Sequence, residues 1–330
     1  MNIQITHSWL KEYLDTDATP PEIQKYLSLS GPTVEGVEKI EDDYVYNFEV
    51  TSNRIDMASV IGIAREASAI LPRFGRKAKL LKREFVLPKL SKNSLTLKIE
   101  DKQRLSNRIL AIIIDGVKVG PSPRFIRQRL EQAGIRSLNN LVDITNYVML
   151  EIGHPTHIFD YDRIKTGKFI FRRGRKGERL ITLDKKSYTL LGGEVVIDDG
   201  TGRIVDLPSI MGTENSVVTN STKRIIFFID NLNPQLIRQA SMTHGIRTLA
   251  ASYNEKSPDP ELSLTALLRG VELLKENASP KSMSKIIDIY SNPVKPKEII
   301  VSVQFINSRI GVELKKKEIT EILKKLGFHV

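Results

Sequence analysis

A run of six apolar residues, from Ile109 to Ile114, constrains the fold of this chain more than any other feature. A strand with one solvated face alternates apolar and polar residues, whereas a continuous run is typical of a strand buried on both faces. The run is far shorter than the roughly 20 residues that cross a bilayer. We therefore expect a central strand inside a domain large enough to cover both sides of a sheet.

The surrounding sequence predicts a mixed α+β domain over residues 86–290. Leu95, Leu97 and Ile99 alternate with polar residues and indicate a second strand. Several strands separated by glycine-rich turns are expected between Phe169 and Ile229. Helices are predicted over 123–134, from Ser137 (a possible cap) to about Leu150, over 234–244 and over 260–277.

The first 85 residues predict a smaller α/β domain. Thr6 or Ser8 is able to cap a short helix, and a Thr-Pro-Pro-Glu sequence at 19–22 begins a second helix that Gly31 ends. A half-buried strand over 44–50 and a helix over 58–71 follow. Residues 73–92 carry many basic side chains, and we interpret them as a connector with some strand character, solvated or in contact with RNA phosphates.

A proline-containing linker at 291–296 precedes the last part of the chain. One strand over 299–303 and two helical segments are predicted there, the second over 316–326. About thirty residues cannot bury a core of their own, because domains below roughly 40 residues need additional constraints. With Phe328 and Val330 resembling the start of a strand, residues 291–330 are expected to be a linker and the truncated beginning of another small domain.

The charge and the lack of cysteine narrow the functional classes. Lys and Arg number 50 against 39 Asp and Glu, a formal charge of +11, and such an excess favours polyanionic partners such as nucleic acid. Without cysteine there is no disulfide, thiolate metal site or cysteine nucleophile. The first five residues alternate between apolar and polar side chains, as a strand does. They lack the charged segment followed by an apolar segment that is typical of a signal peptide. We expect a cytoplasmic protein without membrane contact.

Generic catalytic motifs are missing from the sequence. No phosphate-binding glycine loop, GxSxG or HExxH pattern occurs. His154, His157 and Asp160 could be metal ligands, but Pro155 interrupts helical spacing and no second pair of ligands exists. We therefore predict no metal site.

Four ordered sequence elements carry a resemblance to a known family. The stretch 137–149 (SLNNLVDITNYVM), followed by GHPTHIFD at 153–160, resembles the editing domain of bacterial phenylalanyl-tRNA synthetase beta subunits. NRID at 53–56 with GIARE at 62–66 is similar to an element of the family's first domain. IMG at 210–212 and NSVVT at 215–219 resemble the glycine loop of the editing domain. The last thirty residues resemble the opening of the family's next small domain. The resemblance covers essentially the whole chain and corresponds to the N-terminal half of the beta subunit.

The resemblance implies an α+β fold and a role in attaching phenylalanine to tRNA(Phe). The implied partners are the catalytic alpha subunit and tRNA(Phe), in a heterotetramer. ATP and Mg²⁺ would belong to the holoenzyme, and no cofactor is expected in this chain. Two departures are visible: residues 34–53 leave no room for the tRNA-binding OB-fold that bacterial members insert, and the chain stops before the segments that dock on the alpha subunit.

Editing in this family removes tyrosine attached in error. An apolar pocket for phenylalanine discriminates against the added hydroxyl of tyrosine by only about 10²-fold. In the family a second site therefore hydrolyses tyrosyl-tRNA(Phe). That site needs a hydrogen-bond acceptor for the phenol hydroxyl. The resemblance places Asn146 and His157 near the ester and the terminal adenosine, with Thr145 beside them. Further pocket positions are Ser209, where the family has glycine, Gly212, Phe228, where the family has the accepting glutamate, and Thr248.

We predict that tyrosine editing is weak or lost. A phenyl ring at 228 cannot accept the phenol's hydrogen bond, and a buried unpaired hydroxyl costs about 1–3 kcal/mol. If the alignment slips by one residue, Asp230 is the only nearby carboxylate. Alternatively, Asn146 satisfies backbone groups, His157 is a structural hydrogen-bonding residue and Phe228 belongs to the core. Two other functions stay open: a competent ester hydrolase that uses another carboxylate, and an RNA-binding or interaction module without catalysis.

Overall fold

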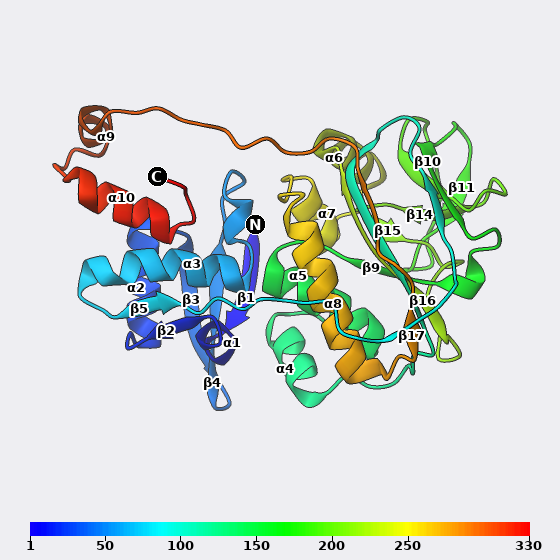
Figure 1. Ribbon diagram of the computed structural model, residues 1–330, viewed down its shortest axis with the longest axis horizontal. Helices are drawn as coiled ribbons and strands as arrows, with labels where there is room; N and C mark the ends of the chain where they lie inside the picture. The colour runs from blue at the N-terminus through cyan, green and yellow to red at the C-terminus, as the bar shows by residue number, and fades with distance from the viewer.

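The computed structural model describes residues 1–330 as two neighbouring domains and a returning C-terminal segment (Figure 1). The N-terminal domain lies on one side and the larger mixed domain on the other. After the larger domain the chain runs back across the molecule, and its last helix lies against the N-terminal domain. The predicted α+β class is confirmed.

The N-terminal domain is built on a three-stranded antiparallel sheet. Its order is β1 (Asn2–Thr6), β4 (Asp43–Glu49), β3 (Thr33–Ile40), and three helices, α1 (His7–Lys11), α2 (Pro20–Ser30) and α3 (Val60–Ile70), accompany it. A second, two-stranded sheet joins β2 (Leu14–Thr16) to β5 (Ala78–Leu80). As predicted, Thr6 caps α1 by accepting from the Trp9 N–H, and α2 ends at Gly31.

The NRID and GIARE elements contact each other within this domain. Asp56 accepts hydrogen bonds from Arg54 and from Arg65 of α3, and Arg54 also contacts Glu66. This explains why the two short motifs occur together: their charged residues form one ion-pair network at the start of α3.

The larger domain contains two packed sheets. One has the order β6 (Ser91–Lys92), β17 (Ser282–Met283), β8 (Ser106–Asp115), β16 (Arg224–Leu232), β9 (His157–Asp160), with β18 (Ile287–Tyr290) also paired to β8. The other has the order β15 (Met211–Gly212), β14 (Ile204–Leu207), β13 (Val195–Asp198), β10 (Lys168–Arg173), β7 (Lys98–Glu100). A separate hairpin joins β11 (Arg179–Ile181) to β12 (Ser187–Thr189).

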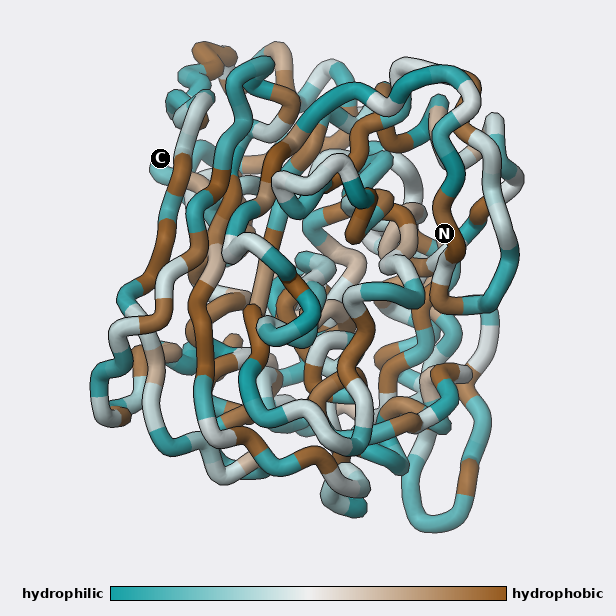
Figure 2. Tube along the Cα trace, turned by 90° about the vertical axis from the view of Figure 1, so that its right-hand side faces the viewer, coloured by the Kyte–Doolittle hydropathy of each residue, from teal (hydrophilic) through white to brown (hydrophobic).

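Two hydrophobic cores meet at β8, which explains its continuous apolar run. Leu110, Ile112 and Ile114 belong to the core that continues into the N-terminal domain. Ile109, Ala111 and Ile113 face the second core, between the two sheets. The prediction of a strand buried on both faces is therefore confirmed. In Figure 2 hydrophobic stretches run along extended parts of the trace, and the outer loops are largely hydrophilic.

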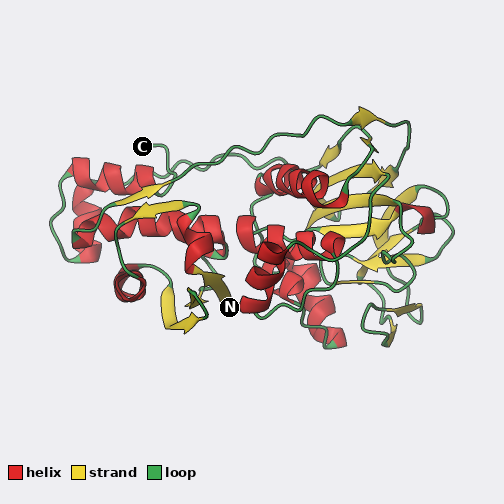
Figure 3. Ribbon diagram, turned by 90° about the horizontal axis from the view of Figure 1, so that it is seen from below, coloured by secondary structure: helices red, strands yellow, loops and turns green.

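Five helices complete the larger domain: α4 (Arg124–Gln132), α5 (Asn140–Ile152), α6 (Pro234–His244), α7 (Leu249–Asn254) and α8 (Leu262–Ala278). Helices α5 and α8 pack together and lie between the sheets and the N-terminal domain (Figure 3). The predicted cap of α5 is wrong by two residues. Asn139 accepts hydrogen bonds from the Leu141 and Val142 N–H groups, while the Ser137 hydroxyl donates to Asp143.

The C-terminal segment holds two exposed helices, α9 (Val303–Ile310) and α10 (Lys316–Lys325). The strand predicted over 299–303 is wrong: these residues have no strand partner, and Ile300 is 94% exposed. An apolar, β-branched sequence alone cannot form a strand without a neighbour to pair its backbone hydrogen bonds. Helix α10 contacts α3, and Arg73 pairs with Glu318. No helix of the chain is both long and apolar enough to span a membrane.

Candidate functional site

A small cavity lies where β9, β14, β15 and the end of β16 approach α7. It measures about 60 Å³, and we call it the His157 cavity. Gly212 forms part of its wall, and its polar lining side chains are Thr156, His157, Asp206, Ser209, Asp230 and Asn254. A cavity of about 150 Å³ holds a benzene ring, so this one is too small to enclose a phenol.

The His157 ring is free of protein hydrogen bonds and lies directly against Gly212. A Cβ atom added at Gly212 would lie 2.9 Å from Cε1 and 3.1 Å from Nε2 of His157, so only glycine lets the ring approach this closely. Burial lowers the pKa of His157 to about 4, which keeps the imidazole neutral at pH 7. No protein group bonds to the nitrogens of His157, and the Phe159 ring packs edge to face against the imidazole with 4.5 Å between ring centroids.

Gly212→Ala tests this contact. We expect the substitution to displace the His157 ring and to lower the free energy of unfolding by about 1–3 kcal/mol, the range for overpacking a filled site. Urea unfolding measures the loss, and the histidine NMR signals report the displaced ring. Gly36→Ala is the matched control, because a Cβ there meets nothing within 4 Å. Equal stability of both variants would contradict the proposed contact.

Two buried carboxyl groups line the cavity from neighbouring strands. Asp206 is 4% exposed and Asp230 is 8% exposed. The Ser209 hydroxyl donates to Asp230 at 2.7 Å, whereas no side chain donates to Asp206. Burial raises the pKa of Asp230 to about 6. Burial, together with the charge of Asp230, raises the pKa of Asp206 well above its ordinary value, so the protonated form of this carboxyl is favoured.

Asp230→Asn is expected to change the pH dependence of stability. Because the pKa of Asp230 is about 6 in the folded chain and about 3.9 when unfolded, its protonated form stabilises the fold at low pH. That contribution is complete below the unfolded value and is lost as the pH rises through about 6. As the pH rises from 4 to 7.5, the free energy of unfolding of the variant should therefore increase by up to about 3 kcal/mol relative to that of the parent.

Urea unfolding at several pH values measures that gain, with the exposed Asp42→Asn as the control for the chemical change. A stability difference between Asp230→Asn and the parent that stays constant with pH would contradict the raised pKa.

The other predicted site residues are placed as follows. Ser209 lines the cavity with its backbone in the left-handed region, φ +63°, which favours the glycine expected there. The Thr248 hydroxyl caps α7 and donates to the Ile210 carbonyl, so it supports the cavity wall. The carbonyl of Thr145 accepts from Thr156, which lines the cavity, but Thr145 itself does not. Asn146 lies outside the lining.

Phe228 lies in the core between the two sheets. Its ring is fully buried and packs with the rings of Phe159, Phe169 and Phe171. The distances between ring centroids are 5.5, 5.6 and 6.3 Å, respectively. It does not line the His157 cavity. The acceptor that does line the cavity from the same strand is Asp230, two residues further along.

The histidines and the aspartate of the GHPTHIFD stretch separate in the structure. His154 is buried, with hydrogen bonds to the Pro155 carbonyl and the Ser263 hydroxyl. Asp160 accepts from Thr222. No group of three His, Cys, Asp or Glu side chains anywhere in the chain could hold a metal ion.

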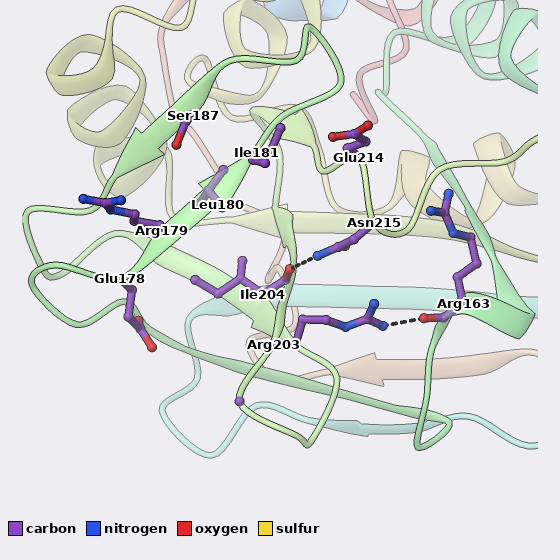
Figure 4. Close-up of a pocket in the computed structure, with 11 residues that line it drawn as sticks. Arg163, Glu178, Arg179, Leu180, Ile181, Ser187, Arg203, Ile204, Glu214 and Asn215 are labelled. Atoms are coloured by element: carbon purple, nitrogen blue, oxygen red, sulfur yellow. Dashed lines mark hydrogen bonds between the residues drawn. The ribbon is translucent and has the colours of Figure 1, made fainter.

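A larger hollow of about 770 Å³ opens beside the β11–β12 hairpin (Figure 4). Its charged groups largely bind the protein: Arg203 pairs with Asp199 and contacts the Arg163 carbonyl, and Glu178 pairs with Arg172. Arg179 and Glu214, of opposite charge, have no salt bridge. The hollow exceeds the His157 cavity in size, but its mixed charges define no single ligand.

Asp206 is a cavity-lining residue that sequence reasoning missed. Its signal was a single acid inside the otherwise apolar run Ile204–Leu207. A carboxyl in such a strand must find a donor or remain costly to bury, so this pattern marks a candidate site.

Comparison with known proteins identifies the class of the domain. A family described as the B3/4 domain matches residues 105–279, and the chain belongs to this family. The chain is 39% identical over 285 residues to the phenylalanine–tRNA ligase beta subunit of Clostridium tetani, covering 86% of this chain and 36% of that protein. It is 37% identical over 307 residues to the beta subunit of Carboxydothermus hydrogenoformans, covering 92% and 38%.

These matches confirm the resemblance to phenylalanyl-tRNA synthetase beta subunits. The chain spans little more than a third of the length of the curated relatives. A crystal structure of an N-terminal fragment of the phenylalanyl-tRNA synthetase beta subunit from Pyrococcus horikoshii is 17% identical, covers 99% of this chain and 89% of that one, and has a TM-score of 0.44.

Proposed function

We propose that this chain acts as part of a phenylalanine–tRNA ligase beta subunit. In this role it supports the attachment of phenylalanine to tRNA(Phe) by a cytoplasmic heterotetramer with the alpha subunit. ATP and Mg²⁺ would bind the alpha subunit. The B3/4 domain and the identity to curated beta subunits over 86% or more of the chain support this proposal.

Tyrosine editing by this chain is weak or lost in our proposal. The observation that carries this part is the size of the His157 cavity, about 60 Å³, less than half of what a benzene ring needs. Phe228, at the position of the family's accepting glutamate, packs in the aromatic core and offers no acceptor. A tyrosyl side chain would therefore lack both space and a partner at that position.

The first experiment tests assembly. This chain replaces the matching N-terminal region of the Clostridium tetani beta subunit, so that the rest of that subunit supplies the docking segments. The chimera is co-expressed with the alpha subunit of that ligase, complex formation is measured by size-exclusion chromatography with light scattering, and phenylalanine attachment to tRNA(Phe) is assayed. We expect a stable and active complex. A chimera that stays separate from the alpha subunit and does not support aminoacylation would overturn the proposed role.

A competent ester hydrolase is the second candidate function. The neutral, unbonded His157 imidazole and the Asp230 carboxyl line one cavity, so a base and an acceptor for a small ligand are both present. Hydrolysis of an aminoacyl ester other than the tyrosyl ester would favour this function over a purely supporting role.

A further inference from the structure

The Asp206 carboxyl has an unused hydrogen-bonding capacity inside the His157 cavity. It is 96% buried as judged from its 4% exposure, lines the cavity and accepts a hydrogen bond from no side chain. The Leu207 backbone amide is the protein donor to this carboxyl. A carboxyl group keeps further acceptor sites beyond one such bond, so it has room for a ligand group that donates a hydrogen bond.

Asp230 adds a second acceptor at the same place. Only the Ser209 hydroxyl donates to it from a side chain, at 2.7 Å and to one of its two oxygens. A carboxylate has about four acceptor sites, so Asp230 keeps capacity for another donor. Ser209 itself shows that a hydroxyl group fits against this carboxyl.

The size of the cavity limits the donor to a compact group. At about 60 Å³, the cavity excludes an aromatic ring and admits a side chain of a few heavy atoms. Gly212 and His157 close one wall, because even one added carbon at Gly212 would collide with the ring. The unbonded nitrogens of His157 remain available to a second polar group of the same ligand.

We propose that the His157 cavity selects aminoacyl esters whose small side chain ends in a hydrogen-bond donor, a hydroxyl or an ammonium group, held by Asp206 and Asp230. The proposal rests on the proposed function of the B3/4 domain, since it assigns the ligand class of the same site. The proposal assigns the selection of the acyl side chain to two residues that the resemblance to the family did not indicate. Asp206 and Asp230 are specificity-determining residues in this account. Asp230 supplies the charged acceptor, and Asp206 adds a carbonyl oxygen that accepts even when the carboxyl is protonated.

The test measures binding of four stable analogues to the full chain by calorimetry. In these 3′-amino-3′-deoxyadenosine amides the acyl group is seryl, 2,3-diaminopropionyl, alanyl or tyrosyl. The seryl and alanyl analogues differ by one hydroxyl, and the diaminopropionyl analogue replaces that hydroxyl with an amine. A hydrogen bond to a charged acceptor is worth about 1.5–3 kcal/mol, so we expect at least one donor analogue to bind about 10-fold or more tightly than the alanyl analogue.

Two variants locate the preference. Asp206→Asn and Asp230→Asn should each reduce the donor-to-alanyl ratio, whereas Glu214→Gln, in the neighbouring hollow, should leave the ratio unchanged. Circular dichroism verifies that each variant is folded, and either aspartate variant alone is sufficient for the test. The seryl and diaminopropionyl arms distinguish a hydroxyl ligand from an amine ligand.

Three results would overturn the proposal: equal binding of the alanyl and donor analogues, tightest binding of the tyrosyl analogue, or no binding of any analogue. Failure of the proposed function is seen separately, as the absence of a complex with the alpha subunit. The binding ranking uses the chain alone and does not depend on that complex.

Discussion

Replacing Glu151 with Leu is expected to lower the free energy of unfolding by about 3 kcal/mol, because it leaves the buried Arg269 paired only with the partly exposed Glu272. The Arg269 Nε–Glu151 Oε2 distance is 2.6 Å, and the two side chains are 4% and 0% exposed. Tyr13, from the N-terminal domain, donates to the same carboxylate at 2.8 Å. The substitution therefore also removes a contact between the two domains. Urea unfolding followed by circular dichroism measures the loss.

The double variant Glu151→Leu with Arg269→Leu is the informative control. With both charges removed, no unpaired ion stays buried, and the loss should be smaller than for Glu151→Leu alone. Glu321→Leu, which breaks the exposed 4.0 Å pair with Lys317, should cost less than about 1 kcal/mol. A double variant less stable than the single one, or a loss below about 1 kcal/mol for Glu151→Leu, would contradict a buried ion pair.

Phe228→Glu is expected to destabilise the chain by about 4 kcal/mol or more and to leave tyrosyl-tRNA(Phe) hydrolysis unrestored. Removing a buried phenyl ring costs about 3–5 kcal/mol, and the new carboxylate would be buried among Phe159, Phe169 and Phe171. The side chain at 228 does not line the His157 cavity, so a glutamate there would not line it without a rearrangement. Thermal unfolding and a deacylation assay measure the two effects.

Phe228→Leu removes the ring without burying a charge, so it separates the two effects. Its free energy of unfolding should fall much less than that of the glutamate variant. Phe125→Glu, at a ring that is 42% exposed, controls for the substitution itself. A stable Phe228→Glu variant that hydrolyses tyrosyl-tRNA(Phe) would show that the cavity reaches position 228 and would contradict the account.

The elements with a strong local pattern could be predicted from the sequence. The apolar run of β8, the capping box of α2 and the Pro234 start of α6 each contain their own signal within a few residues. The strand predicted over 299–303 failed because a strand depends on a partner elsewhere in the chain. The Asn139 cap of α5 was missed because Ser137 has a suitable hydroxyl, which donates to Asp143 instead.

The cavity was only partly predictable, because strand register brings its residues together. The resemblance supplied His157, Ser209 and Gly212, which all line it. Asp206 pairs with Gly212 across β14 and β15, and no local pattern indicates that pairing. Phe228 and Asp230 lie on the same face of β16, yet only Asp230 reaches the cavity, and this difference depends on the surrounding side chains.

Deacylation of tyrosyl-tRNA(Phe) by the purified chain tests the central claim most directly. The account predicts hydrolysis at the rate of the uncatalysed ester, with alkaline treatment showing that the substrate is intact. The Ser209→Gly variant, which removes the side chain that narrows the cavity and restores a residue suited to φ +63°, is measured beside it. Rapid enzyme-dependent release of tyrosine by the natural chain would contradict the account, because the cavity would then have to accommodate the phenol.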